Sequence, residues 1–112
     1  MEGSPFSEAD IVEYARWFTQ PGRATAGFNL YRTYATVDVE HWHTDRERIL
    51  DLPTLWVHGM QDPFVPAGHL NLLSSTFTNL RIERFEECGH WMPEEAPERT
   101  ASVLHDFLRE LA

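Results

Sequence analysis

"TLWVHGMQDPFVP", residues 54–66, is the stretch that decides the fold. It opens with a short apolar run that ends in Gly59, a pattern that predicts a β-strand buried on both faces. Further along, "LRIERFEECG" at residues 80–89 has Ile82 and Phe85 as its apolar positions and predicts a second strand. The fold therefore depends on what connects and covers these two strands.

Each of the two strands is followed by a helical pattern. Residues 66–77, "PAGHLNLLSSTF", begin at a proline suited to a first helical turn, and residues 96–111 keep their apolar side chains on one helical face. The order strand, helix, strand, helix predicts an α/β fold built on a parallel βαβα unit. Two parallel strands need cover on both faces and both edges, so we expect the end of a larger sheet.

The first part of the chain is predicted to be helical instead. Residues 4–18, "SPFSEADIVEYARWF", carry the cap candidate Ser7 and one apolar stripe, and the pattern stops at Pro21 and Gly22. A second helix is expected over residues 23–35, forming a hairpin with the first. Residues 36–52 are polar enough to predict an irregular connector on the surface.

Two residues with catalytic chemistry follow the two strands at similar offsets. Asp62 comes shortly after the first strand and His90 shortly after the second. In a right-handed crossover both strands point the same way, so their C-terminal loops meet at one rim. A carboxylate there can accept a hydrogen bond from one imidazole nitrogen while the other nitrogen takes a proton.

Each residue also has an ordinary structural explanation. Aspartate before proline commonly starts a turn, and histidine after glycine can be a turn residue with a satisfied hydrogen bond. Taken singly, each explanation is the better one. Taken together, on adjacent parallel strands with matched offsets, Asp62 and His90 favour a functional pair.

Composition excludes some classes of partner. The 112 residues carry a formal net charge of −9 and include no lysine, which argues against nucleic acid and anionic membranes as partners. The single cysteine, Cys88, cannot form an internal disulfide, and the start of the chain has no signal-peptide pattern. A cytoplasmic protein is expected.

The sequence around the pair resembles a known family. "LPTLWVHGMQDPFVP" and "FEECGHWMPEEAPE", residues 52–66 and 85–98, are similar to the acid and histidine loops of the α/β-hydrolase fold. The resemblance implies that Asp62 is the triad acid and His90 the triad base. It also implies two regions: residues 1–50 as the distal part of a helical cap domain with a connector, and residues 51–112 as the C-terminal part of the core.

Within that family, the first 50 residues resemble the caps of epoxide hydrolases and of their haloalkane and haloacetate dehalogenase relatives. A tyrosine directly before an arginine in the caps of epoxide hydrolases matches "YR" at Tyr31 and Arg32. The match implies that Tyr31 donates a hydrogen bond to the epoxide oxygen of a small apolar substrate. The implied mechanism forms an alkyl ester on an aspartate, which water activated by His90 then hydrolyses, with no cofactor or metal. Trp91 would line the mouth of the pocket or pack over the loop.

Other motifs are given structural roles. "HWH", His41 to His43, has strand-like spacing, but no acidic or cysteine ligand completes a metal site. Cys88 is expected to be a buried, inert thiol. "PEEAPE", residues 93–98, is expected to favour the dipole of the following helix and to do nothing more.

The sequence contains neither G-x-D-x-G nor G-x-S-x-G, so the nucleophile elbow is missing. We therefore expect a fragment of an epoxide-hydrolase-like enzyme that is inactive in isolation. The alternatives are a dehalogenase or esterase fragment, or a non-catalytic domain that binds or assembles. In the last case the open edge of the sheet would support self-association.

Overall fold

The computed structural model describes residues 4–112. The chain divides into two compact units, Met1–Arg48 and Ile49–Ala112. The first is helical and the second contains the sheet. The assignment of the first unit to a cap domain stays a prediction.

The second unit is built on the two predicted strands. β1 (Thr54–Gly59) and β2 (Leu80–Phe85) are parallel and pair in register from Thr54 with Leu80 to Gly59 with Phe85. A short 3₁₀ turn, η2 (Ala67–His69), and α4 (Leu70–Leu73) form the crossover, and α5 (Met92–Glu95) and α6 (Pro97–Glu110) follow β2. This confirms the α/β class and the parallel βαβα order.

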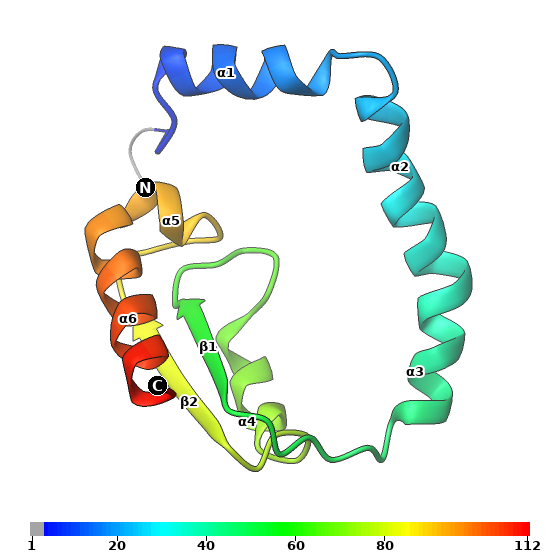
Figure 1. The fold of residues 1–112 in the computed structure, drawn as a ribbon, viewed down its shortest axis with the longest axis vertical. Helices are drawn as coiled ribbons and strands as arrows, with labels where there is room; N and C mark the ends of the chain where they lie inside the picture. The colour runs from blue at the N-terminus through cyan, green and yellow to red at the C-terminus, as the bar shows by residue number, and fades with distance from the viewer. Residues whose placement is uncertain (1–3) are drawn as a thin grey trace. The chain divides into compact units, whose positions relative to one another are not determined.

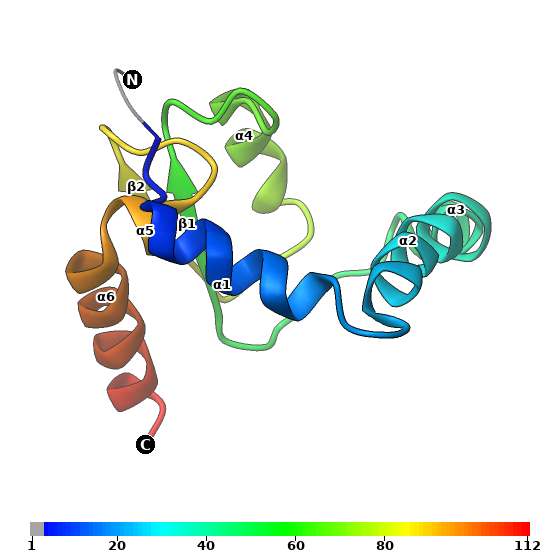
Figure 2. The same ribbon diagram turned by 90° about the horizontal axis from the view of Figure 1, so that it is seen from above.

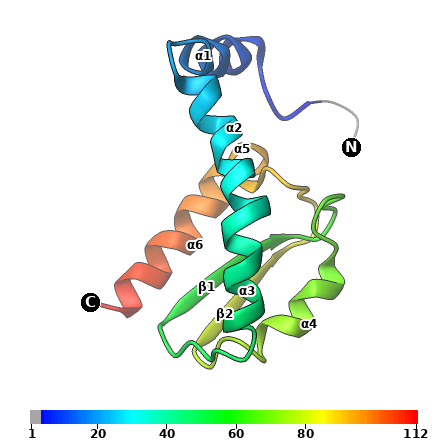
Figure 3. The same cartoon turned by 90° about the vertical axis from the view of Figure 1, so that its right-hand side faces the viewer.

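Helices cover both faces of the strand pair. The views in Figures 1 and 3 place α6 on one side of β1 and β2 and α4 on the other. The crossover helix is shorter than the sequence predicts, because hydroxyl side chains at its end compete with the helical backbone. The Ser75 hydroxyl, for example, donates to the carbonyl oxygen of Leu72 at 2.7 Å.

The core of the second unit is small. Phe85 is fully buried, and Leu70 and Cys88 are the other buried apolar side chains described. Large apolar side chains on α6 remain exposed, namely Leu104 and Leu108. The unit therefore has apolar surface left over that two strands and their helices do not cover.

In the first unit, α1 (Glu8–Phe18) begins at Ser7 as predicted. The backbone N–H of Asp10 donates to the Ser7 hydroxyl at 3.2 Å, and the Asp10 carboxylate accepts from the Ser7 N–H at 2.8 Å. This reciprocal capping box satisfies two donors that the first turn otherwise leaves without partners. The helix then ends before Pro21 and Gly22.

The two predicted helices form a corner instead of a hairpin. In Figure 2, α1 is seen along its length, whereas α2 (Arg23–Thr33) is seen close to end-on. Gly22 makes the corner with a φ of 81°, a left-handed conformation that glycine adopts without strain. The rings of Phe18 and Phe28 pack edge to face across it, with centroids 6.4 Å apart.

The prediction of an irregular connector over residues 36–52 is wrong for most of its length. α2 continues through a π-helical turn, η1 (Tyr34–Asp38), into α3 (Val39–Asp45). No proline or glycine lies between residues 28 and 45, so this stretch has no strong helix breaker. Tyr34 and Trp42 pack edge to face across the π-turn, at 5.1 Å between ring centroids.

In the part of the chain that the structure describes, no helix is both long enough and apolar enough to cross a bilayer.

Candidate active site

The loop after β1 holds Asp62 in a fixed turn. Its backbone N–H donates to the Gly59 carbonyl at 3.1 Å, and its Oδ1 accepts from the N–H groups of Phe64 and Val65 at 2.7 and 3.1 Å. An aspartate that hydrogen-bonds the backbone two and three residues ahead is typical of a tight turn. One carboxylate oxygen is thus used by the turn, and the other is left to face a neighbouring loop.

That second oxygen meets His90. Oδ2 of Asp62 lies 2.8 Å from Nδ1 of His90, and the Asp62 side chain is only 5% exposed. Since an ionised carboxylate only accepts, Nδ1 carries the proton of this bond, and in the neutral imidazole the remaining lone pair lies on Nε2. The structure thus confirms that the two residues meet at the rim, while their catalytic roles stay predictions.

Burial raises the pKa of the Asp62 carboxyl, but its hydrogen bonds outweigh that effect. The bonds from the His90 ring and from the N–H groups of Val65 and Phe64 favour the ionised form, as does the charge of His90 when it is protonated. The net result is a pKa below the ordinary value. Asp62 therefore remains a carboxylate at neutral pH, as an orienting acid requires.

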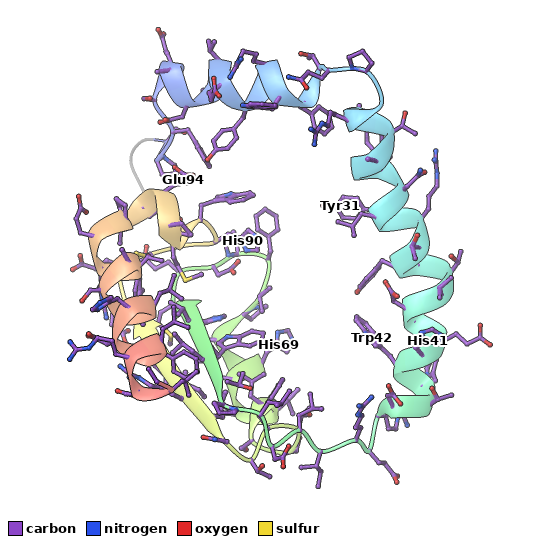
Figure 4. All side chains as sticks on the ribbon, in the orientation of Figure 1. Tyr31, His41, Trp42, His69, His90 and Glu94 are labelled. Atoms are coloured by element: carbon purple, nitrogen blue, oxygen red, sulfur yellow. The ribbon has the colours of Figure 1, made fainter. Side chains whose placement is uncertain are left out.

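Two aromatic rings contact the His90 imidazole. Phe64 and Trp91 each pack edge to face against it, with ring centroids 5.1 and 5.2 Å from the imidazole. Figure 4 shows His90 on the loop that precedes α5. Trp91 was named from the sequence, whereas Phe64 was missed. An aromatic residue two positions after the turn aspartate was the available signal.

A comparison with protein-family models places this geometry in a known fold. The model described as the alpha/beta hydrolase fold matches residues 12–97, well over half of the chain. The chain belongs to the α/β-hydrolase fold family. Its helices and its parallel two-strand sheet form a fragment of that fold.

Several curated members of the family are similar in sequence. The chain is 33% identical over 66 residues to monoacylglycerol lipase ABHD6 of Rattus norvegicus and 35% identical over 63 residues to 2-hydroxymuconate semialdehyde hydrolase of Pseudomonas putida. These matches cover 59% and 56% of this chain and 19% and 22% of the relatives. Epoxide hydrolase 4 of Homo sapiens is 23% identical over 111 residues, covering 97% of this chain and 29% of the relative.

A solved structure is similar over most of the chain. The crystal structure of Cfl2 from Burkholderia cenocepacia superposes with a TM-score of 0.73 and 31% sequence identity, covering 92% of this chain and 34% of that one. The chain thus spans about a fifth to a third of the length of these relatives. The remainder of the α/β-hydrolase fold has no counterpart in the 112 residues.

Tyr31 belongs to the helical unit. It lies on α2, where the residue is 72% exposed, and it is labelled in Figure 4. The same unit has an open apolar cavity of about 500 Å³. The cavity is lined by residues of α1 and α2, namely Tyr14, Ala15, Trp17, Phe18, Arg23 and Gly27. The assignment of Tyr31 as a hydrogen-bond donor stays a prediction.

The histidines of "HWH" do not have strand geometry. His41 and His43 lie on α3, where two residues are separated by about 200° around the helix axis, so their rings point to different sides. Within residues 4–112, no three histidine, cysteine, aspartate or glutamate side chains gather closely enough to hold a metal ion. The strand-like spacing read from the sequence is therefore wrong.

Cys88 lies next to the histidine loop, but its thiol is not activated. Burial raises its pKa, and the negative charge of Glu95 raises it further, against a smaller opposing effect of Arg99. A thiol whose pKa is raised stays protonated at neutral pH and is a poor nucleophile. This favours the structural role expected from the sequence.

Gly59 allows the acid and histidine loops of this α/β-hydrolase unit to approach each other. A Cβ atom at this position would overlap the carbonyl oxygen of Gly89 and lie 2.7 Å from that of Cys88. Both neighbours are backbone atoms, so no side-chain rotation relieves the overlap. The short strand end "HG" is therefore required for the close packing of the two loops.

We expect Gly59→Ala to separate the two loops. The overlap should destabilise the second unit by roughly 1–3 kcal/mol, as other overpacked sites do. Urea unfolding would measure the loss, and the NMR signal of the His90 Nδ1 proton should weaken as Asp62 and His90 move apart. Gly68→Ala is the matched control, because a Cβ there meets nothing within 4 Å. Equal stability of the two variants would contradict the close approach.

Proposed function

We propose that this chain carries the acid–base part of an α/β-hydrolase active site of the epoxide hydrolase type. The observation that carries the proposal is the 2.8 Å hydrogen bond between Asp62 and His90 Nδ1. A base held in this way keeps its Nε2 available for a water proton, and the buried carboxylate stabilises the imidazolium that then forms. The substrate class is a small, largely apolar epoxide.

The chemistry proceeds in two steps. An aspartate outside these 112 residues attacks an epoxide carbon, the carbon–oxygen bond breaks, and Tyr31 donates a hydrogen bond to the oxygen on which negative charge develops. His90 Nε2 then takes a proton from water as the hydroxide attacks the ester carbonyl carbon. The ring-opened oxygen takes one proton from solvent, the His90 imidazolium returns its proton to the oxygen that leaves the ester, and the aspartic acid that forms ionises. The diol then leaves, and water is the only molecule consumed besides the epoxide.

The extent of similarity supports an epoxide over another substrate. The match to epoxide hydrolase 4 covers 111 residues, so it includes the helical unit that carries Tyr31. The matches to the lipase and the semialdehyde hydrolase cover 66 and 63 residues. Similarity that extends over the helical unit supports similar substrate contacts there.

Ester hydrolysis is the second candidate, favoured by the higher identity of 33% to monoacylglycerol lipase ABHD6. A serine nucleophile would use the same Asp62 and His90 pair, with His90 accepting the serine proton. The coding sequence upstream of Met1 separates the two. An in-frame G-x-D-x-G would favour the epoxide reaction, whereas G-x-S-x-G would favour an ester.

The role of Tyr31 is tested in a hybrid in which this chain replaces the matched segment of epoxide hydrolase 4. We expect Tyr31→Phe to lower kcat for styrene oxide by about 10²-fold, because one donor to a developing oxyanion is lost. Initial rates of diol formation measure the effect. A hybrid with no His90-dependent diol formation would contradict the proposed function.

The matched control for this experiment is Tyr34→Phe. It also removes one hydroxyl from the same helical unit, and it leaves the edge-to-face contact with Trp42 intact. We expect this variant to keep the parent kcat. Equal losses in the two variants would show that Tyr31 has no specific role at the epoxide oxygen.

A further inference from the structure

A second carboxylate, that of Glu95, contacts the histidine loop. Its Oε2 accepts from the backbone N–H of Gly89 at 2.6 Å, and its Oε1 accepts from the backbone N–H of Trp91 at 3.0 Å. Gly89 and Trp91 are the two neighbours of His90 in the chain. One side chain therefore holds the backbone on both sides of the histidine.

Glu95 is well anchored for this task. It ends the short helix α5, and its own N–H donates to the Trp91 carbonyl at 2.9 Å. The buried Thr100 on α6 joins the two helices, because its hydroxyl lies 3.1 Å from the Met92 carbonyl oxygen and 2.8 Å from that of Ala96. The helix that carries Glu95 is thus linked to the long C-terminal helix.

The start of α5 explains why the loop needs such a partner. Trp91 is the capping residue of α5, and its side chain makes no capping hydrogen bond. The first N–H groups of a helix and of the turn before it require acceptors. Glu95 supplies two charged acceptors at once, and charge-assisted hydrogen bonds of this kind are stronger than neutral ones.

We propose that Glu95 is a positioning residue for His90. Asp62 fixes the imidazole ring through Nδ1, and Glu95 fixes the peptide backbone that carries the ring. Without the two hydrogen bonds to Glu95, the backbone of the histidine loop can move. The 2.8 Å bond with Asp62 is then the remaining hydrogen bond that orients the imidazole. The importance of this for catalysis rests on the proposed function of His90.

The competing explanation is that Glu95 acts only through its charge, by interacting with the helix dipole or the nearby histidine. Two substitutions separate the effect of the Glu95 charge from the effect of its side-chain length. Glu95→Asp keeps the charge but is one methylene shorter, so it cannot span both N–H groups. Glu95→Gln keeps the length and one acceptor oxygen but removes the charge. Glu98→Gln, at an exposed glutamate in the first turn of α6, is the matched charge control.

The test uses the 112-residue chain and NMR. Amide hydrogen exchange at Gly89 and Trp91 reports on the backbone tether, and the ¹⁵N shifts of the His90 ring report which nitrogen carries the proton. In Glu95→Asp we expect exchange at one or both amides to be roughly 10- to 100-fold faster, as for a lost charged hydrogen bond. We also expect the Nδ1–H tautomer to lose population.

Glu95→Gln should show a smaller effect on the same signals, and Glu98→Gln should match the parent chain. Parent-like exchange and tautomer in Glu95→Asp would overturn the proposal, as would a larger change in Glu95→Gln than in Glu95→Asp. Neither readout depends on turnover. An inactive hybrid would therefore count against the epoxide reaction and leave the positioning role of Glu95 standing.

Discussion

Asp62→Asn is expected to lower the epoxide turnover of the hybrid by on the order of 10⁴-fold while the loop stays folded. Asparagine keeps a carbonyl oxygen for the N–H groups of Phe64 and Val65, which hold the turn. Its amide group then faces His90 Nδ1 in place of Oδ2. Since an amide N–H only donates, it favours a histidine that carries its proton on Nε2, where it cannot accept one from water.

The measurement is kcat for styrene oxide, together with the ¹⁵N shifts of the His90 ring in the 112-residue chain. We expect the tautomer to change from Nδ1–H to Nε2–H in the variant. Asp51→Asn, at an exposed aspartate in the segment before β1, is the matched control and should change neither. Full activity of Asp62→Asn, or an unchanged tautomer, would remove Asp62 from the proposed mechanism.

The same substitution should also reduce the acid sensitivity of the chain. The pKa of the Asp62 carboxyl is lowered in the folded state from its ordinary value of 3.8. A lowered pKa contributes stability above pH 3.8, and this stability is lost as the pH falls through the folded value. The free energy difference between parent and Asp62→Asn, from urea unfolding between pH 6 and pH 2, should therefore shrink as the pH falls.

Much of the fold was predictable because its signals are local. The run at residues 54–59 predicts β1 from its apolar residues and its terminal glycine, and the cap candidate Ser7 predicts where α1 begins. The meeting of Asp62 and His90 needed one further step, from strand direction to a shared rim. That step is reliable because parallel strands place their C-terminal loops side by side.

The remaining features depend on interactions that have no periodic signal. Glu95 reads as an acidic residue near a helix start, and only the path of the chain brings its two oxygens to the amides around His90. The helix over residues 34–45 was missed because its polar composition is typical of a connector. The signal that predicts this helix is the absence of proline and glycine between residues 28 and 45.

Phe85→Ala is expected to unfold the second unit. Phe85 is the one large side chain in the described residues with no exposed surface, and the Arg99 guanidinium lies 3.9 Å from its ring centroid. Truncating a buried phenylalanine costs roughly 3–5 kcal/mol. A core that otherwise buries only Leu70 and Cys88 among its apolar side chains has little means of filling the space.

Phe85 also joins the fold to the site, because its carbonyl oxygen accepts from the N–H of Met60 in the acid loop at 3.0 Å and from that of Cys88 in the histidine loop at 3.2 Å. Loss of this strand end should therefore remove the His90 Nδ1 signal together with the cooperative urea transition. Phe64→Ala deletes the same atoms from an exposed ring and should change stability by about 0.5 kcal/mol or less. If Phe85→Ala kept the parent transition, the two loops would have to be held together by something other than this core.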